Sequence, residues 1–124
     1  MKNQVSDGKV VGVVASALAK PSHSDSLPHS GDQVVVGSLV GVATESAAAS
    51  TDTIDVQTEG VFNLSVTGTD NSGNSAVAVG DKIYVDSGSN AALTKNSTKT
   101  EFGIALGVVT TGSTATIPVK VTGF

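Results

Sequence analysis

The chain has 124 residues, which suffices for one compact domain and leaves little room for a second hydrophobic core. Eleven acidic residues against seven lysines and no arginine give a net charge of −4, so the chain lacks the basic surface that phosphate neutralisation requires. The absence of cysteine excludes disulfides, thiol catalysis and cysteine-ligated zinc. We therefore expect no nucleic-acid partner and no redox chemistry.

The apolar residues are of an unusual kind. Hydrophobic residues make up 39% of the chain, and twenty of them are valine, whereas only three phenylalanines and one tyrosine are aromatic. Large aromatic side chains usually dominate the energetics of a core. We therefore expect a thin, β-branched core to which association with other chains adds stability. No apolar run approaches the roughly 18 residues of a membrane-spanning helix, and we expect no membrane partner.

Short strand-like runs alternate with clusters of Gly, Ser, Asn and Asp along the chain, a spacing typical of small barrels and sandwiches. The expected strands cover residues 9–15, 33–36, 39–43, 53–58, 61–66, 82–85, 103–109 and 116–121. Polar segments 43–50, 67–75 and 86–101 are expected to be loops. Pro118 lacks a backbone donor and predicts an edge strand or a bulge. The sequence predicts an all-β fold, a small β-barrel or β-sandwich, with an extended N-terminal arm (1–9) before a single β domain (10–124).

Three motifs occur twice in the same order. They are Gly31–Val36 with Gly80–Val85, Gly41–Thr44 with Gly107–Thr110, and Thr53–Val56 with Thr116–Val119. Gly60 and Gly123 are each followed within two residues by a phenylalanine. The order of the motifs favours a chain built from two similar halves, with a pseudo-repeat over residues 31–62 and 80–124.

The Gly-Asp pairs at the start of two expected strands predict turns. Glycine permits a positive φ, and the aspartate carboxylate accepts hydrogen bonds from nearby backbone amides. An alternative, a paired-carboxylate site formed by Asp32 and Asp81, is weaker because aspartate after glycine is common in turns. The residues expected to act as structural turns are Gly31, Asp32, Gly60, Gly80, Asp81, Gly107 and Gly123.

The two histidines lie in a serine- and proline-rich segment (21–30) that is typical of an exposed loop. A metal site could be imagined from His23, Asp25 and His29, but a metal site also needs a rigid support and further hydrogen bonds around its ligands. The chain's only Gly-Lys pair is followed by Val10, so no phosphate-binding loop is present. We predict no catalytic, cofactor or metal residues, and hence that the protein is not an enzyme.

An ordered set of short motifs spans nearly the whole chain. The set comprises Met1–Asn3, Gly31–Asp32, Val36–Ala43, Thr58–Phe62, Gly80–Tyr84, Ile104–Gly107 and Gly123–Phe124. In this order the motifs resemble a family of small tailed-phage proteins that cement or decorate capsids. Some members carry an older label of predicted recombinase, which the missing phosphate loop contradicts. The segment 19–30 is longer than this resemblance leads us to expect.

The resemblance implies a structural virion protein that binds the outer surface of an expanded phage capsid and stabilises contacts between capsomers. It implies the major capsid protein as partner, synthesis in the host bacterial cytoplasm, and a homo-oligomer. A trimer at local threefold positions is favoured, and a dimer at twofold positions is the alternative. Two other readings stay open: a β-rich segment of a phage fibre or surface adhesin, and a small sugar-binding or enzymatic domain.

The polar N-terminal end is the candidate capsid-binding arm, because an extended segment can add a strand to an exposed sheet edge. A frayed terminus is the competing interpretation. The candidate capsid contacts are Met1, Lys2, Asn3, Gln4, Val5 and Ser6.

Overall fold

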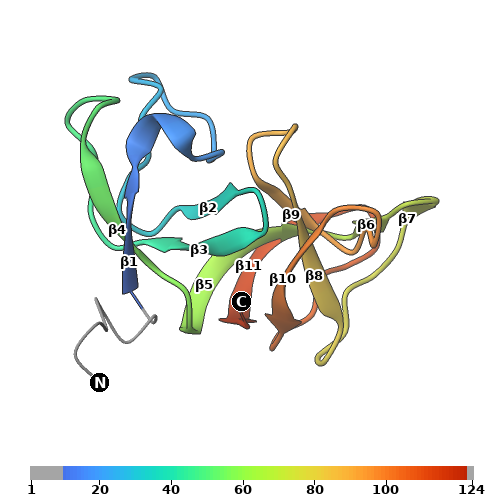
Figure 1. Cartoon of the computed structure of the whole chain (residues 1–124). Coiled ribbons are helices and arrows are strands. Elements are labelled where there is room, and N and C mark those ends of the chain that lie inside the picture. Colours follow the sequence, from blue (N-terminus) through green and yellow to red (C-terminus); the bar gives the residue numbers. More distant parts are fainter. Residues whose placement is uncertain (1–9, 123–124) are drawn as a thin grey trace.

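The computed structural model describes residues 10–122, whose regular secondary structure is β-strand except for one 3-10 turn, η1 (Ala15–Ala17) (Figure 1). The first sheet has the strand order β1-β4-β3-β2, the second has the order β5-β11-β10-β8-β9, and β6 and β7 form a separate hairpin. The strands of the first sheet are β1 (Val10–Val14), β2 (Gln33–Val36), β3 (Leu39–Ala43) and β4 (Thr53–Gln57). Those of the second are β5 (Gly60–Thr67), β8 (Lys82–Asp86), β9 (Ala92–Thr94), β10 (Thr100–Ala105) and β11 (Thr114–Val121). The predicted all-β fold is confirmed.

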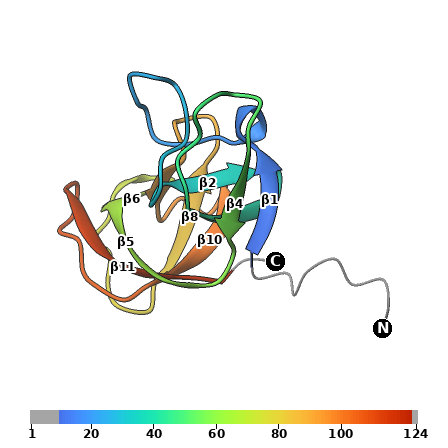
Figure 2. The ribbon, with the colours of Figure 1, turned by 90° about the vertical axis from the view of Figure 1, so that its left-hand side faces the viewer.

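Both sheets are built on one plan, although the copies do not have the expected bounds of 31–62 and 80–124. Across the first sheet lie the first, fourth, third and second of its strands as numbered along the chain. Every neighbouring pair is antiparallel. The second sheet places β5, β11, β10 and β8 in the same order and adds β9 beside β8. The two sheets curl side by side, blue to green and green to red in Figures 1 and 2. The repeating unit thus starts with β1 in one copy and with β5 in the other.

Backbone hydrogen bonds align the two copies residue by residue. In the first copy, the N–H of Gly31 donates to the Ala43 carbonyl (2.8 Å), and the Ala43 N–H donates to the Asp32 carbonyl (2.9 Å). In the second, Gly80–Asp81 make the same two bonds with Ala105, at 2.8 Å each. Ala43 and Ala105 are therefore structurally equivalent.

This alignment makes Gly41 the counterpart of Gly103, four residues before Gly107. The predicted match of Gly41 with Gly107 is therefore wrong. The motif pairs before and after it in the sequence are correctly matched. A Cβ on Gly41 would lie 2.5 Å from the carbonyl oxygen of Gln57, and a Cβ on Gly103 would meet the carbonyl oxygen of Lys120. Both glycines allow the adjacent strand to approach closely, which no other residue permits.

The core is rich in valine, as the composition predicts. Among the buried hydrophobic residues of the described chain, Phe102 is the only aromatic one. The larger core cluster lies mainly under the second sheet and also includes Val35, Val40 and Val42 of the first. The two sheets therefore share part of one core. A smaller cluster packs around Ile54 and Val56 of the first sheet.

Pro118 lies in an interior strand, so the prediction of an edge strand is wrong. Strand β11 pairs with β5 on one side and β10 on the other. The Pro118 carbonyl accepts a bond from the Leu106 N–H (2.9 Å), which places the missing proline N–H on the β10 side. Pairing with β10 ends one residue away, at Ala105 and Val119. Pro118 thus lies where the hydrogen-bonded pairing of β10 with β11 ends, and not in an edge strand.

Two segments expected to be loops contain short strands. Residues 67–75 hold the hairpin of β6 (Thr69–Asp70) and β7 (Gly73–Asn74), whose turn is closed by the Asp70 carboxylate accepting from the Ser72 and Gly73 amides. Residues 86–101 hold β9 and the start of β10. Strands of two or three residues show no periodicity in the sequence. The segment 44–50 is irregular, as predicted.

Candidate binding surfaces

The structure places the predicted turn residues at the start or end of strands. Gly31 (φ 93°) and Gly80 (φ 96°) occupy equivalent turns before β2 and β8, and Gly60 (φ 128°) opens β5. Gly107 lies in the bend after β10. Gly123, like the candidate capsid contacts 1–6, falls outside the described residues.

The aspartates of the two equivalent turns have separate partners. The Asp32 carboxylate accepts the backbone N–H of His29 (2.8 Å), and the Asp81 carboxylate accepts that of Ala78 (2.8 Å). The Ala78 amide, with Lys95 as a further contributor at 3.2 Å, lowers the pKa of Asp81. Each carboxylate is therefore engaged at its own turn, as a turn residue would be.

The histidine-containing loop is held together by two pairs of side chains. The imidazole rings of His23 and His29 stack in parallel with their centroids 3.8 Å apart. His23 Nε2 lies 2.7 Å from an Asp32 oxygen, and His29 Nε2 lies 2.9 Å from an Asp25 oxygen. The Leu27 amide is the largest cause of the lowered pKa of Asp25, followed by the bond from His29. The loop is thus tied to the turn before β2.

Asp25, His29 and His23 do not form the cluster that a metal site would need. Asp25 contacts His29, whereas His23 contacts Asp32. Within residues 10–122, no group of three or more histidine, aspartate or glutamate side chains could hold a metal ion.

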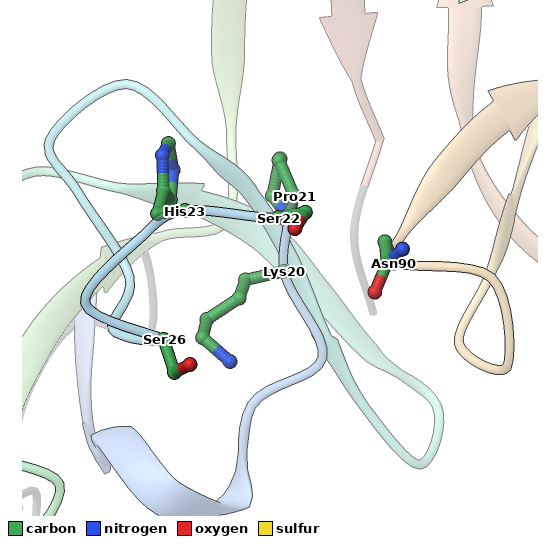
Figure 3. Close-up of a pocket in the computed structure, with 6 residues that line it drawn as sticks. All are labelled: Lys20, Pro21, Ser22, His23, Ser26 and Asn90. Atoms are coloured by element: carbon green, nitrogen blue, oxygen red, sulfur yellow. The ribbon is translucent and has the colours of Figure 1, made fainter.

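A shallow hollow forms where the long loops of the two copies meet. Its volume is about 100 Å³, well under the roughly 300 Å³ of the smallest usual ligand pockets. The hollow is lined by Lys20, Pro21, Ser22, His23, Ser26 and Asn90 (Figure 3). The buried Gln33 amide donates to the Ala91 carbonyl at 3.0 Å and so joins the first copy to the second loop. Sequence reasoning singled out both loops but gave no sign that they meet.

Exposed aliphatic side chains are the feature that sequence reasoning missed. Six large ones are exposed among the described residues, namely Val10, Val14, Val61, Val79, Leu106 and Val108. The last two fall in a segment (103–109) that reads as one continuous strand, although β10 ends at Ala105. Because the residues on both sides of Ala105 are apolar, the sequence does not show where the buried strand ends and the exposed bend begins.

A family model described as phage cement protein matches residues 5–121. The chain belongs to this phage cement protein family, whose members are structural, capsid-associated phage proteins and not enzymes. Comparisons with curated proteins and with solved structures gave no match. Among residues 10–122, no helix is long and apolar enough to span a membrane.

Proposed function

We propose that the protein binds the outer surface of the phage capsid, through the major capsid protein, and stabilises the contacts between capsomers. The observation that carries this proposal is the match to the phage cement protein family over residues 5–121. A subunit that touches more than one capsomer adds contacts that must break before the capsomers separate. The shell would then resist the pressure of packaged DNA without any chemical step.

The architecture suits a load-bearing role. The two sheets share buried side chains from both copies, including Val40 of the first and Phe102 of the second. Closely packed interiors are poorly compressible and transmit strain, so a force applied at one sheet reaches the other. The module therefore couples the surfaces at its two sides mechanically.

We further propose a homo-oligomer, with a trimer favoured over a dimer. A chain of this size exposes roughly 6,000 Å² as a monomer. A standard interface takes about 800 Å² from each partner. Two neighbours and a capsid footprint would cover more than a third of the surface, which suits a protein with few aromatic residues in its core. The mass in solution distinguishes trimer, dimer and monomer.

The test of the main proposal is to add the purified protein back to expanded capsids that lack it. Microscopy should show density on the outer surface at symmetry-related positions between capsomers, and the decorated shells should rupture at a higher temperature than bare shells. Unexpanded shells prepared from the same phage serve as the comparison. A protein that leaves expanded shells bare would refute the proposal.

The N-terminal segment has its own test. Deletion of residues 1–6 should lower occupancy on expanded capsids if Met1 to Ser6 form a capsid-binding arm. The unfolding temperature of the truncated protein, measured beside the full chain, shows whether the β domain is intact. Unchanged occupancy would sink the arm hypothesis and leave the main proposal standing.

A further inference from the structure

The duplicated architecture offers an internal comparison of two surfaces on one backbone. In the second copy, Val79, Leu106 and Val108 are 63%, 41% and 67% exposed. We call these three residues the valine–leucine patch. The residues at the equivalent positions of the first copy are polar, so the two copies can be compared position by position.

The counterparts are identified by equivalent backbone positions. Val79 directly precedes the turn glycine of the second copy, as Ser30 does in the first. The Leu106 N–H donates to the Pro118 carbonyl at 2.9 Å, just as the Thr44 N–H donates to the Asp55 carbonyl at 3.0 Å. Ser30 and Thr44 are thus the structural counterparts of Val79 and Leu106.

A third bond extends the alignment to Val108. The Val109 N–H donates to the Val77 carbonyl at 3.0 Å, and the Ala47 N–H donates to the Pro28 carbonyl at 3.0 Å. Because Ala47 matches Val109, the preceding residue of the first copy, Ser46, matches Val108.

In the first copy the three polar residues bond to one another. The Ser30 amide donates to Ser46 Oγ at 3.0 Å, and the Ser30 hydroxyl donates to the Thr44 carbonyl at 3.3 Å. In the second copy, backbone bonds between Gly80 and Ala105 and between Val77 and Val109 bracket the patch. The three residues therefore lie close together along the backbone at one end of the second sheet, and each is exposed.

The fold does not require aliphatic side chains at these positions, since the first copy adopts the same backbone with two serines and a threonine. Exposed aliphatic groups that cluster in this way usually mark an interaction site. We propose that the valine–leucine patch is the apolar anchor through which the protein contacts the major capsid protein. This inference rests on the proposed function of capsid binding.

The size of the patch favours the capsid over a second copy of this chain as its occupant. A stable interface takes about 800 Å² and some 20–30 residues from each partner, far more than three side chains. A capsid presents many sites to an oligomer at once, so a small anchor on each subunit suffices for tight attachment.

The surroundings of the patch define the chemistry of the partner. The flanking segments 75–80 and 105–113 contain no charged residue. A few buried aliphatic groups within a polar rim are typical of the centre of an interface. The Asp81–Lys95 ion pair lies beside segment 75–80, since Lys95 also donates to the Ala76 carbonyl. The partner surface is therefore an apolar depression with polar groups at its rim.

The test replaces each patch residue by its counterpart in the first copy, giving Val79→Ser/Leu106→Thr/Val108→Ser. The matched control is Val10→Ser/Val14→Ser/Val61→Ser, which removes three other exposed valines (40%, 38% and 57% exposed). Binding of each variant to expanded capsids is measured, and mass in solution and unfolding temperature are recorded for each. If the triple patch variant does not fold, Val108→Asp takes its place.

The patch variant should bind at least about tenfold more weakly than the natural protein, and the control should bind within about twofold of it. If the patch variant binds capsids as well as the natural protein does, the inference about the patch is overturned and the proposed capsid binding stands. Failure of the natural protein itself to bind would instead refute the proposed function. A patch variant that loses its oligomeric state would assign the patch to self-association and would overturn the inference as well.

Discussion

Asp32 and Asp81 accept the same hydrogen bond in the two copies of the fold, from the backbone N–H three residues before each of them, at 2.8 Å in both cases. Their second partners differ, because Asp32 contacts the His23 imidazole and Asp81 contacts the Lys95 ammonium. The turn geometry is thus common to both copies, while the side chain that covers it comes from a different loop.

Asp81 should contribute to stability at neutral pH. Asp81→Ala should lower the free energy of unfolding by about 1–2 kcal/mol at pH 7, because a charge-assisted hydrogen bond to Ala78 is lost. Since the pKa of Asp81 is lowered in the folded state, this contribution is complete above pH 4 and is lost as the pH falls through the folded value. Urea unfolding at a series of pH values should show the two proteins converging below about pH 4.

The control for this experiment is Glu59→Gln, which removes one exposed carboxylate and changes the net charge equally. A difference between the natural protein and Asp81→Ala that stays constant from pH 7 down to pH 2 would contradict the assignment of the effect to the ionised carboxylate.

Asp25 should titrate below its ordinary range, and His29 should account for only part of the shift. The Leu27 amide is the largest cause of the lowered pKa, and the His29 side chain adds to it. In His29→Ala the pKa of Asp25 should therefore rise part of the way toward its ordinary value. Carboxyl NMR titration measures both pKa values. A complete return to the ordinary value in the variant would show that the Leu27 bond has no effect.

Gly41 and Gly103, at which a neighbouring strand approaches closely, should not tolerate a side chain. Gly41→Ala and Gly103→Ala would each press a methyl group against the backbone of the neighbouring strand. We expect each to lower the free energy of unfolding by about 1–3 kcal/mol or more. Gly88→Ala is the control, because a Cβ there would lie 3.4 Å from its nearest neighbour, an Asp86 oxygen. Equal unfolding midpoints for all three variants would contradict the close approach.

Phe102 should be the most costly single side chain to truncate. It is fully buried, and β10 carries an irregularity between Glu101 and Gly103 that places it in the core. Phe102→Ala should lower the free energy of unfolding by about 3–5 kcal/mol, which is measurable by denaturant titration. Val61→Ala, at an exposed site, should change it by less than about 0.5 kcal/mol. A small loss of stability in Phe102→Ala would mean that neighbouring side chains move in to fill the cavity left by the ring.

Local signals predicted most of the fold. The alternation in residues 53–58 identifies β4, and the Gly-Asp pairs before β2 and β8 identify equivalent turns, because these features depend on neighbouring residues alone. Strand β9 has three residues and no period, so it could not be found in this way. The interior position of Pro118 depends on where β10 ends, which is a property of pairing between distant segments.

The candidate surfaces were less accessible to sequence reasoning. The loop around His23 was identified as a surface loop, but its contact with Asp32 and its meeting with Asn90 depend on three-dimensional packing. Leu106 and Val108 were hidden inside an apolar run. The meaning of the valine–leucine patch came from comparison with Ser30, Thr44 and Ser46. That comparison required the hydrogen-bond alignment of the copies, since the sequence match around Gly41 is displaced by four residues.

The strand order common to the two sheets also bears on how the chain folds. Among residues 10–122 every strand pairing falls within one copy, so neither sheet takes a partner strand from the other half. Within each copy the first strand pairs with the last, β1 with β4 and β5 with β11, so a long segment must close before each sheet is complete. Such non-local pairing raises the contact order and slows folding. Docking through shared side chains such as Val40, together with the hydrogen bond from Gln33 to the Ala91 carbonyl, joins the halves. Two fragments divided between Gln57 and Gly60 should therefore reassemble when mixed.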